Sequence, residues 1–365
     1  MTRPPRIAIA AGGTAGHVVP ALAVADALRA EGAEVVFIGG ERAEAALVPA
    51  AGYELRTLSV AGLDRRNPLK AARAALLAVG AVARSIRVLR SLRTDAVLGG
   101  GGYVAGPVGL AAVLLRVPLV LSEADSHLGI SNRLLARFAR RVCLAFPIAG
   151  RSGARYRVTG RPVPPPATDR AAARARFGLG EEDTVVLVFG GSLGARSINT
   201  AALEAFSGAT FRVLHAAGAR DFATLVSPGA HYDLREYIHD FGEALLAADL
   251  VVARAGGSIF EVAAAGKPAI LIPYPAATAD HQTSNAHWME QGAAAVVIPD
   301  VELTAARLAH EVGELLHDRA RLAAMAHASA ALARPEAAGE IAGEVLAAAG
   351  ARPGSLSGTS QARTR

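Results

Sequence analysis

Short apolar segments alternate with longer segments of helical periodicity along most of the chain. The apolar segments predicted as strands are residues 6–10, 35–38, 95–98, 119–121, 142–145, 184–189, 211–214, 250–253 and 269–272. From residue 304 onward the pattern is helical. Strands that alternate with helices usually form a parallel sheet with helices on both faces. The pattern therefore predicts an α/β protein.

The alternation is interrupted once, at the proline-rich stretch 160–166, which is typical of a stiff connector. We expect an N-terminal domain at residues 1–160, a linker at 161–167, a C-terminal domain at 168–350 and a disordered tail at 351–365. One glycine-rich turn from strand to helix opens each half, which indicates two Rossmann-like domains facing each other across a cleft. The last helices are expected to return across that cleft.

Composition narrows the choice of partners and compartment. The 365 residues carry a formal net charge of +6. No basic stripe interleaved with aromatic residues accompanies this charge, so nucleic acid is not indicated as a partner. The charge fits an anionic substrate or an anionic membrane surface. Cys143 is the single cysteine, which excludes an intrachain disulfide and favours a reducing cytoplasm.

The most apolar window, residues 103–121, contains Pro107, Arg116 and Pro118. A spanning helix needs about 20 mostly apolar residues without such breaks, so we interpret the window as a loop, a buried helix and a strand. The apolar run at residues 7–10 is too short for a signal peptide.

The stretch after the strand at 250–253 has the pattern of a phosphate cradle. Residues 254–258 (Arg-Ala-Gly-Gly-Ser) separate this strand from a helix expected to open at Ile259. Glycines at such a turn let backbone N–H groups approach an anion, and a helix N-terminus adds about half a positive charge. Glu261 follows within a turn and can accept hydrogen bonds from vicinal sugar hydroxyls, and a polar cluster lies at 280–285. The predicted ligand is a nucleotide joined to a group with several hydroxyls.

Two further glycine-rich loops lie in the N-terminal half. The loop at 11–17 leads into a helix expected to begin near Pro20, and the four glycines at 99–102 indicate a close approach of backbone to a ligand or to another segment. The first loop lacks the G-x-G-x-x-G spacing of dinucleotide-binding turns, and no Walker lysine follows either loop. The chain also contains no Asp-x-Asp pair, so a metal held by carboxylates is not expected.

Without such a metal, the charge on a departing nucleoside diphosphate would be met by backbone N–H groups and by Arg or Ser side chains. Ser192 and the turn at Gly256, Gly257 and Ser258 suit that role. His17 follows the first glycine loop, and its imidazole can take a proton from an attacking hydroxyl. The same spacing suits a histidine that braces or caps the loop. The pattern favours glycosyl transfer.

These loops together resemble the MurG family, the undecaprenyl-diphospho-muramoylpentapeptide β-N-acetylglucosaminyltransferases, over residues 7–348. The motifs that carry the resemblance are Gly12–Val18, Gly101–Pro107, Gly190–Arg196 with Asn199, Arg254–Gly256, Glu261–Gly266, and His281–Gln282 with Asn285. The resemblance implies the two-domain GT-B fold and no cofactor. It implies inverting transfer of N-acetylglucosamine from UDP-N-acetylglucosamine (UDP-GlcNAc) to the muramoyl 4-hydroxyl of lipid I, undecaprenyl-diphospho-MurNAc-pentapeptide, which gives lipid II in peptidoglycan synthesis.

The resemblance also implies site residues. The implied base is His17, with Glu261 in support. Ser192 is implied to bind the diphosphate, Glu261 the ribose, Ile238 the uracil and Gln282 the donor sugar. The implied donor-binding set is Thr14, Ala15, Gly16, Asp125, Arg161, Ser192, Ile238, Gly256, Gly257, Ser258, Glu261, His281 and Gln282. The implied acceptor-binding set is Gly101, Gly102, Tyr103 and Gly106, and no metal site is implied.

Three positions depart from the commoner family pattern and indicate a divergent branch. Asp125 stands where an amide is usual, and Pro164 stands where an arginine is usual. Arg161, three residues earlier, is the candidate substitute for that arginine. The segment from Arg254 to Glu261 is one residue shorter than in better-known members.

Because the family's acceptor is a polyprenyl lipid, the resemblance implies a peripheral protein at the cytoplasmic face of the cell membrane. Residues 67–93 are predicted to form an amphipathic basic helix pair that lies on an anionic membrane surface. A core-facing apolar stripe under a solvated arginine face would give the same pattern.

Other functions remain open on the sequence alone. Another GT-B glycosyltransferase, acting on diacylglycerol or a natural product, is the nearest, although the acceptor loop at 99–107 argues against it. A UDP-N-acetylglucosamine 2-epimerase would convert its donor without any acceptor. A non-catalytic paralogue would bind the UDP-sugar without transfer or hydrolysis.

Overall fold

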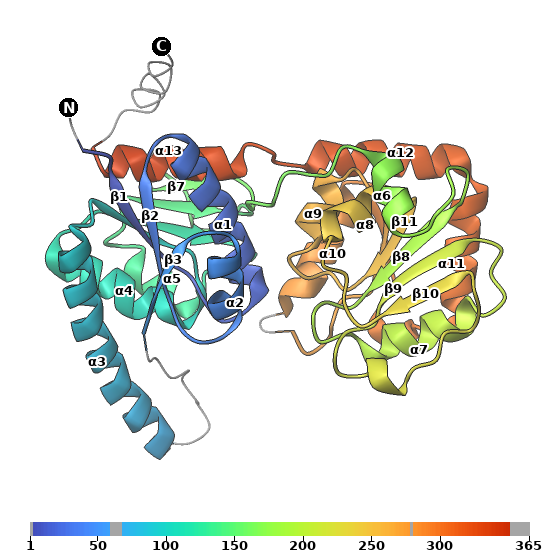
Figure 1. Cartoon of the computed structure of the whole chain (residues 1–365), viewed down its shortest axis with the longest axis horizontal. Helices are drawn as coiled ribbons and strands as arrows, with labels where there is room; N and C mark the ends of the chain where they lie inside the picture. The colour runs from blue at the N-terminus through green and yellow to red at the C-terminus, as the bar shows by residue number, and fades with distance from the viewer. Residues whose placement is uncertain (1–2, 59–67, 278–279, 351–365) are drawn as a thin grey trace, which may run out of the picture. The chain divides into compact units, whose positions relative to one another are not determined.

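The computed structural model describes residues 3–58, 68–277 and 280–350, and for residues 68–78 it describes the backbone alone. The chain divides into two compact units (Figure 1). The first contains the residues up to Val163 together with those from Arg334 onward, and the second contains Pro164–Ala333. The boundary at Val163 lies within the predicted linker, whereas residues from Arg334 to the end of the predicted second domain belong to the first unit.

The first unit is a parallel sheet of seven strands with helices on its faces (Figure 1). Its strands are β1 (Arg6–Ala10), β2 (Glu34–Gly39), β3 (Glu54–Thr57), β4 (Ala96–Gly99), β5 (Leu119–Glu123), β6 (Arg141–Leu144) and β7 (Tyr156–Val158). Its helices are α1 (Ala15–Ala30), α2 (Ala43–Ala50), α3 (Pro68–Leu92), α4 (Gly102–Leu115), α5 (Ile130–Leu135) and α13 (Ala337–Ala348). The strand order is β3-β2-β1-β4-β5-β6-β7.

The second unit repeats the design with a six-stranded parallel sheet in the order β10-β9-β8-β11-β12-β13. Its strands are β8 (Val185–Phe189), β9 (Arg212–Ala216), β10 (Tyr232–Arg235), β11 (Leu250–Ala253), β12 (Ala269–Leu271) and β13 (Ala295–Val297). Its helices are α6 (Arg170–Arg176), α7 (Arg196–Ala205), α8 (Phe241–Ala247), α9 (Ile259–Ala264), α10 (His281–Gln291), α11 (Ala305–His317) and α12 (Arg319–Leu332), with short 3₁₀ turns η1 (Phe222–Thr224) and η3 (Asp300–Glu302). The prediction of an α/β protein with two Rossmann-like sheets is confirmed.

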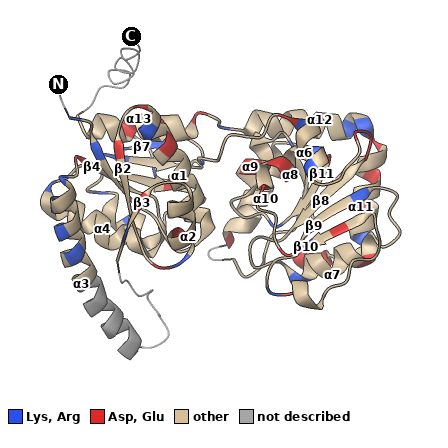
Figure 2. Ribbon diagram, viewed as in Figure 1, with Lys and Arg blue, Asp and Glu red and all other residues tan. Residues whose placement is uncertain are grey.

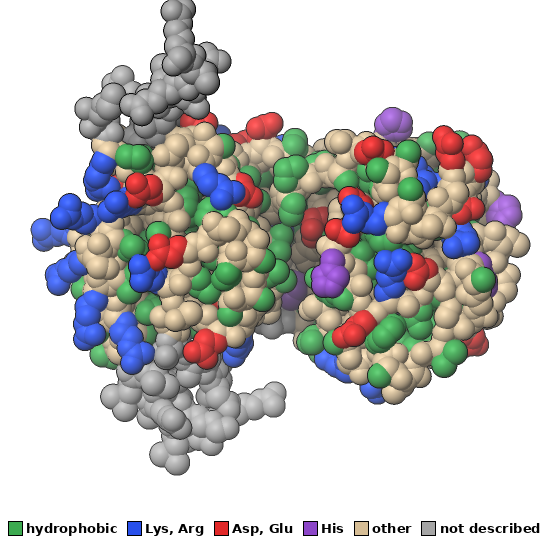
Figure 3. Space-filling model, viewed as in Figure 1, with side chains coloured by type: hydrophobic (Ala, Val, Ile, Leu, Met, Phe, Trp, Pro, Cys, Tyr) green, Lys and Arg blue, Asp and Glu red, His purple; other side chains and the backbone are tan. Residues whose placement is uncertain are grey.

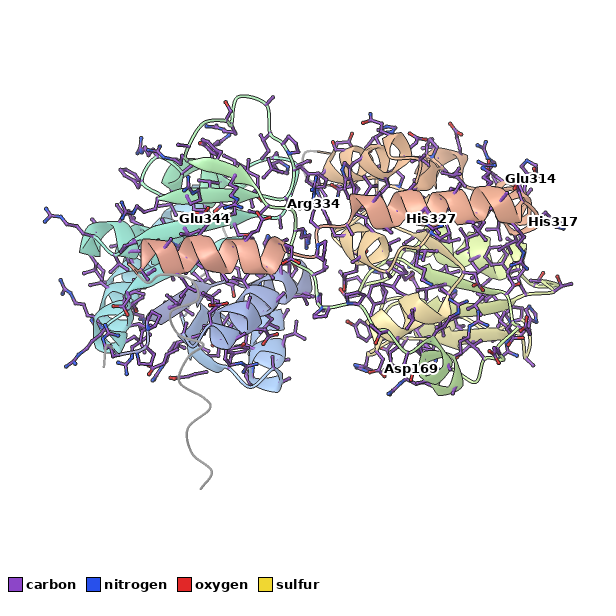
Figure 4. All side chains as sticks on the ribbon, turned by 90° about the horizontal axis from the view of Figure 1, so that it is seen from above. Asp169, Glu314, His317, His327, Arg334 and Glu344 are labelled. Carbon is purple, nitrogen blue, oxygen red and sulfur yellow. The ribbon has the colours of Figure 1, made fainter. Side chains whose placement is uncertain are left out.

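The C-terminal helix α13 completes the core of the first unit. Ile341, Val345 and Leu346 are buried in the cluster that covers one face of the sheet, where α13 packs against α1, β4 and β5. Glu344, on the same helix (Figure 4), accepts hydrogen bonds from Arg141 on β6 (2.7 Å) and from Arg157 on the edge strand β7 (2.9 Å). The last helix of the chain is therefore tied to the first unit by both apolar packing and ion pairs.

Two predictions about helices are wrong. The first helix begins at Ala15 instead of near Pro20, because Thr14 is its extended N-cap residue and its carbonyl already accepts hydrogen bonds from the backbone N–H groups of His17 and Val18. Residues 68–92 form the single helix α3 instead of a helix pair, since no proline or glycine pair interrupts them. Asn67, the first residue of the predicted pair, lies outside the described residues.

Candidate functional site

Both glycine-rich turns of the first unit lie where its strand order reverses. The chain leaves β1 toward β2 on one side, and β4 pairs with β1 on the other side. The loops after β1 and β4 therefore diverge at the carboxyl ends of neighbouring strands, which is the usual place for a ligand in an open parallel sheet. In the second unit the same relation holds between β8 and β11. Each unit thus has one topological switch point, built from glycine-rich turns.

His17 lies in the first turn of α1, directly after the first glycine loop, and is half-buried. Its Nδ1 is 3.2 Å from the Thr14 hydroxyl, and in the tautomer whose Nδ1–H donates to that oxygen, Nε2 is the nitrogen that can take up a proton. The ring also packs on Gly101, where a Cβ atom would lie 2.5 Å from the His17 Cδ2. Burial lowers the pKa of His17, Asp125 raises it and Arg161 lowers it again, with a net lowering. The imidazole is therefore neutral at pH 7 and can accept a proton.

The loop after β5 is held in place by the buried carboxylate of Glu123. Glu123 Oε2 accepts hydrogen bonds from Gly129 N (2.8 Å) and Asn132 Nδ2 (2.9 Å), and Oε1 accepts one from Asp125 N (3.2 Å). Burial raises the pKa of Glu123, and its hydrogen bonds act in the opposite direction. These bonds present Asp125 on the loop, close enough to His17 to raise its pKa.

Arg161 joins two loops of the first unit. Its guanidinium is buried and donates to Gly16 O (2.5 Å) and Ala124 O (3.1 Å). Gly16 lies beside His17, and Ala124 lies beside Asp125. The structure therefore gives Arg161 a bracing contact to both loops, and its predicted part in donor binding stays a prediction.

The glycines predicted to bind the acceptor lie at the beginning of a helix instead of in a long loop. The turn after β4 is short, and α4 starts at Gly102, so Tyr103 and Gly106 are helical. This differs from the prediction of a loop at the start of the window 103–121. Gly102 has φ +78°, and a Cβ atom there would collide with the backbone oxygen of Gly12. Gly106 faces the Ser131 side chain of α5, where a Cβ atom would lie 3.0 Å from its hydroxyl oxygen. The first turn of α4 thus packs against the loop after β1.

In the second unit, the turn between β8 and α7 leaves Ser192 exposed. Gly191 and Gly194 both have positive φ, and a Cβ atom on Gly194 would collide with Ala217 O. The close packing at Gly194 fixes the turn against the end of β9. Ser192 is thereby presented at the switch point with its hydroxyl accessible.

The turn after β11 is braced from beneath by Arg254. Its buried guanidinium donates to Asp300 (2.6 Å), to Ser197 Oγ (2.8 Å) and to the carbonyl oxygens at the end of β12. Asn285 Nδ2 donates to Ala255 O at 2.9 Å, which ties α10 to the same turn. The predicted donor residues Gly256, Gly257 and Ser258 follow directly and are partly exposed.

Several predicted donor residues come together around this turn. Gln282, in the first turn of α10, accepts a hydrogen bond from Tyr274 N (3.0 Å), and a Cβ atom on Gly256 would lie 3.9 Å from its Nε2. Glu261 is in the first turn of α9, and His281 begins α10. Ile238 lies in the loop between β10 and α8, where its buried side chain anchors the backbone.

A buried polar chain supports the Ser192 turn from below. Asn199 on α7 donates from Nδ2 to Ala217 O (2.9 Å), so its Oδ1 accepts from His215 Nε2 (3.1 Å). His215 Nδ1 then accepts from the Tyr232 hydroxyl at 2.7 Å. With the imidazole neutral, the Tyr232 hydroxyl donates to Nδ1 and Nε2–H donates to Asn199, so both ring nitrogens have a partner. Burial lowers the pKa of His215 to about 4.

The hydrogen bonds of the neutral His215 predict that acid destabilises the second unit. Above pH 6.5, His215 is neutral in both the folded and the unfolded chain. Between pH 6.5 and about 4 only the unfolded chain takes up the proton, so the free energy of unfolding falls by about 3 kcal/mol over that interval. Trp288, the single tryptophan, stacks on Phe260 in this unit, so urea titrations at pH 7 and pH 4.5 followed by its fluorescence measure the effect. A His215→Gln variant should show a smaller difference between the two pH values, and an equal difference would contradict the prediction.

Sequence comparison with known proteins identifies both units. Residues 7–144 match the profile "Glycosyltransferase family 28 N-terminal domain", and residues 185–341 match "Glycosyltransferase family 28 C-terminal domain". A relative from Moorella thermoacetica is 42% identical over 91% of this chain and 96% of its own length. A relative from Rubrobacter xylanophilus is 44% identical over 89% of this chain and 98% of its own length. Both are named "UDP-N-acetylglucosamine--N-acetylmuramyl-(pentapeptide) pyrophosphoryl-undecaprenol N-acetylglucosamine transferase".

The chain belongs to the MurG family. The crystal structure of Acinetobacter baumannii MurG matches it with a TM-score of 0.72 and 29% identity, over 94% of this chain and all of that one. The resemblance inferred from the six motifs and the assignment to the GT-B fold are both confirmed.

Sequence reasoning missed several residues that brace the MurG-family loops. They are Glu44, which accepts hydrogen bonds beneath the first glycine loop, Glu123 and Asp300. A glutamate four residues after the pair Gly39–Gly40 and next to two alanines is a weak signal for Glu44. Within the described residues, no group of three or more His, Cys, Asp or Glu side chains is arranged to hold a metal ion. In the same ranges no helix combines the length and apolar character needed to cross a membrane.

Proposed function

We propose that this protein transfers N-acetylglucosamine from UDP-GlcNAc to the 4-hydroxyl of the muramoyl unit of lipid I, producing lipid II. The observation that carries the proposal is the 42% identity, over nine-tenths of the chain, to a transferase named for this reaction. The glycine-rich switch point of each unit supports it, because the reaction needs two separate diphosphate-bearing substrates to be bound.

The second unit binds the donor in this proposal. Ser192 and the N–H groups of the turn Gly256–Ser258 hold the diphosphate of UDP, and Glu261 accepts hydrogen bonds from the ribose hydroxyls. The backbone of Ile238 binds uracil, and Gln282 with His281 contacts the sugar. Fixed donors of this kind stabilise the charge that develops on UDP as it departs. The position of the Gln282 side chain next to Gly256 and the exposed Ser192 support this assignment.

The first unit binds the acceptor and supplies the base. The first turn of the 14-residue helix α4, with Gly101 and Gly102, directs backbone N–H groups at the lipid diphosphate. His17 Nε2 removes the proton of the 4-hydroxyl while that oxygen attacks C1 of N-acetylglucosamine. The bond between C1 and the phosphate oxygen breaks, UDP leaves with the electron pair, and the configuration at C1 inverts. Thr14, Ala15, Gly16, Asp125 and Arg161 surround His17 or brace its loop.

The reaction class is tested by following UDP release and the fate of the sugar. The full-length protein is incubated with UDP-GlcNAc, with and without a short-chain lipid I analogue. We expect UDP release only when the acceptor is present. Formation of the 2-epimer without acceptor would identify an epimerase, and tight donor binding without release in either case would identify a non-catalytic paralogue. A preference for diacylglycerol would point to another GT-B transferase.

We also propose that the first unit docks on the anionic cytoplasmic surface of the membrane through α3, α4 and α5. Exposed basic side chains gather along α3 (Figures 2 and 3). Among the residues whose side chains the structure describes, these are Arg84, Arg87 and Arg90. Exposed apolar residues on this and neighbouring segments are Val79, Leu110, Leu114, Ile130, Leu134 and Phe138. Val82, Ile86 and Leu89 instead pack into the core, so the core-facing interpretation holds for that stripe. The side chains of Leu69, Leu76 and Leu77 lie outside the described set.

Replacing Arg84, Arg87 and Arg90 together with serine should weaken binding to phosphatidylglycerol vesicles by roughly 100-fold, since each basic group near an anionic surface contributes about 1 kcal/mol. Vesicle co-sedimentation at low and high salt measures the effect. The matched control replaces Arg220, Arg319 and Arg321, exposed residues of the second unit, with serine and should bind as the wild type does. Equal binding by the two triple variants would contradict docking through α3.

A further inference from the structure

Glu44 is a fully buried carboxylate in the first turn of α2, beneath the switch point of the first unit. Its Oε2 accepts a hydrogen bond from Gly13 N (2.8 Å). Its Oε1 accepts hydrogen bonds from Gly40 N (2.8 Å) and from the Tyr103 hydroxyl (2.9 Å). These donors lie after β1, after β2 and at the start of α4, so one side chain ties together segments that follow three adjacent strands.

Three glycines pack closely around Glu44 and its partner Tyr103. A Cβ atom on Gly12 would lie 2.7 Å from Glu44 Oε1, and one on Gly39 would lie 2.8 Å from Glu44 Cγ. A Cβ atom on Gly40 would collide with the Tyr103 hydroxyl. The glycines on either side of the carboxylate therefore let the loops close directly onto it. The hydrogen bonds outweigh the effect of burial, which would raise the pKa of Glu44, so the pKa is lowered and the group is ionised at pH 7.

The segments held by Glu44 are those that carry the proposed catalytic groups. The loop through Gly13 leads directly into the turn that carries His17, and Tyr103 follows Gly101 and Gly102 in the first turn of α4. The His17 ring in turn packs on Gly101. A shift of either loop would move the imidazole relative to the N–H groups of α4, and displacements near 1 Å can cost about 100-fold in rate.

We propose that Glu44 is a positioning residue for the transfer reaction, which fixes His17 and the first turn of α4 relative to each other by holding the loops after β1, β2 and β4. The inference rests on the proposed function. It also accounts for Tyr103, whose hydroxyl is engaged with Glu44. Tyr103 thus acts on the acceptor side through its contact with this carboxylate.

The test compares Glu44→Gln with Tyr103→Phe and with the matched control Glu41→Gln, an exposed glutamate in the turn just before α2. The amide of Gln cannot accept hydrogen bonds at its nitrogen, so either Gly13 N or the pair Gly40 N and Tyr103 loses its acceptor. We expect kcat for transfer to the lipid I analogue to fall roughly 10- to 100-fold in Glu44→Gln, with the KM for UDP-GlcNAc unchanged. Tyr103→Phe should lose about three- to tenfold, and Glu41→Gln should match the wild type.

The pH profile distinguishes positioning from a general loss of folded protein. The groups whose charge acts on His17 are Asp125, Arg161 and Glu44. Because Glu44 raises the pKa of His17, its neutralisation should move the acid limb of kcat to lower pH, and the control should leave the limb in place. Wild-type kcat in Glu44→Gln, or a loss confined to KM for the donor, would overturn the inference while leaving the proposed function intact.

The same variants also decide two other outcomes. If Glu44→Gln does not fold, Tyr103→Phe decides, since it removes a single hydroxyl, and an unchanged kcat there overturns the inference. If the wild type transfers no sugar, the proposed function fails and the inference falls with it.

Discussion

The His17→Ala variant should lose roughly 10²- to 10⁴-fold in kcat while binding UDP-GlcNAc as tightly as the wild type does. The size is that of a general base removed from a reaction at neutral pH. Donor binding should survive because His17 itself is not among the proposed donor contacts. Initial rates with a lipid I analogue and calorimetric titration with the donor measure the two quantities. His327→Ala, which removes an exposed histidine on α12 (Figure 4), is the matched control and should leave both unchanged.

The pH dependence of the transfer rate tests the same role of His17. The base must be neutral, and burial lowers the pKa of His17 below its ordinary 6.5 despite the opposing effect of Asp125. The midpoint of the decline in rate with falling pH should therefore lie below pH 6.5. Asp125→Asn removes a carboxylate that raises this pKa, so the decline should begin at still lower pH. A decline with its midpoint above pH 7, or a His17→Ala variant within tenfold of the wild type, would contradict the role of His17 as base.

The second large effect is expected at Glu261. Glu261→Ala should lower kcat/KM for UDP-GlcNAc by roughly 10²- to 10⁴-fold, because a carboxylate that accepts hydrogen bonds from two hydroxyls contributes about 1.5–3 kcal/mol for each. Glu261→Gln keeps one acceptor oxygen and should lose less. Steady-state kinetics with varied donor give these values. The matched control is Glu290→Ala, since Glu290 is an exposed residue of α10 paired only at the surface with His287.

A donor analogue tests whether the ribose is the group that Glu261 recognises. The wild type should discriminate against 2′-deoxy-UDP-GlcNAc, because the deoxy analogue leaves the carboxylate without one of its donors. Glu261→Ala should use both donors almost equally. If the variant keeps the full discrimination of the wild type, Glu261 does not bind the ribose.

The sequence predicts the interior of each sheet well and its edges poorly. The predicted strands at 6–10 and 250–253 coincide with β1 and β11, which are central and buried on both faces, so their apolar runs are continuous. The strands that the pattern does not predict are β3, β7, β10 and β13, and all four lie at sheet edges. Residues such as Glu54–Thr57 or Tyr232–Arg235 include charged side chains that edge positions tolerate. Pattern analysis therefore has no apolar run to detect there.

Some residues of the candidate site can be recognised from the sequence and others cannot. Turns that need glycine, such as those at Gly102 and Gly194, are visible in the sequence because few other residues fit a backbone with positive φ. Glu44 and Arg254 are not visible in this way, because their partners come from several loops that meet only in the folded sheet. The contacts of the buried Arg161 guanidinium with Gly16 and Ala124 are likewise not visible in the sequence, and its part in donor binding stays a prediction. A side chain's sequence neighbours do not identify its hydrogen-bond partners.

The most direct test of the account is transfer of labelled N-acetylglucosamine from its UDP donor to a short-chain lipid I analogue in the presence of EDTA, with the product analysed by mass spectrometry and NMR. The account predicts addition of one N-acetylglucosamine through a β-linkage at the muramoyl 4-hydroxyl, and no product with an acceptor that lacks this hydroxyl. Tight binding of UDP-GlcNAc without any transfer to lipid I, or transfer to a different position, would contradict it.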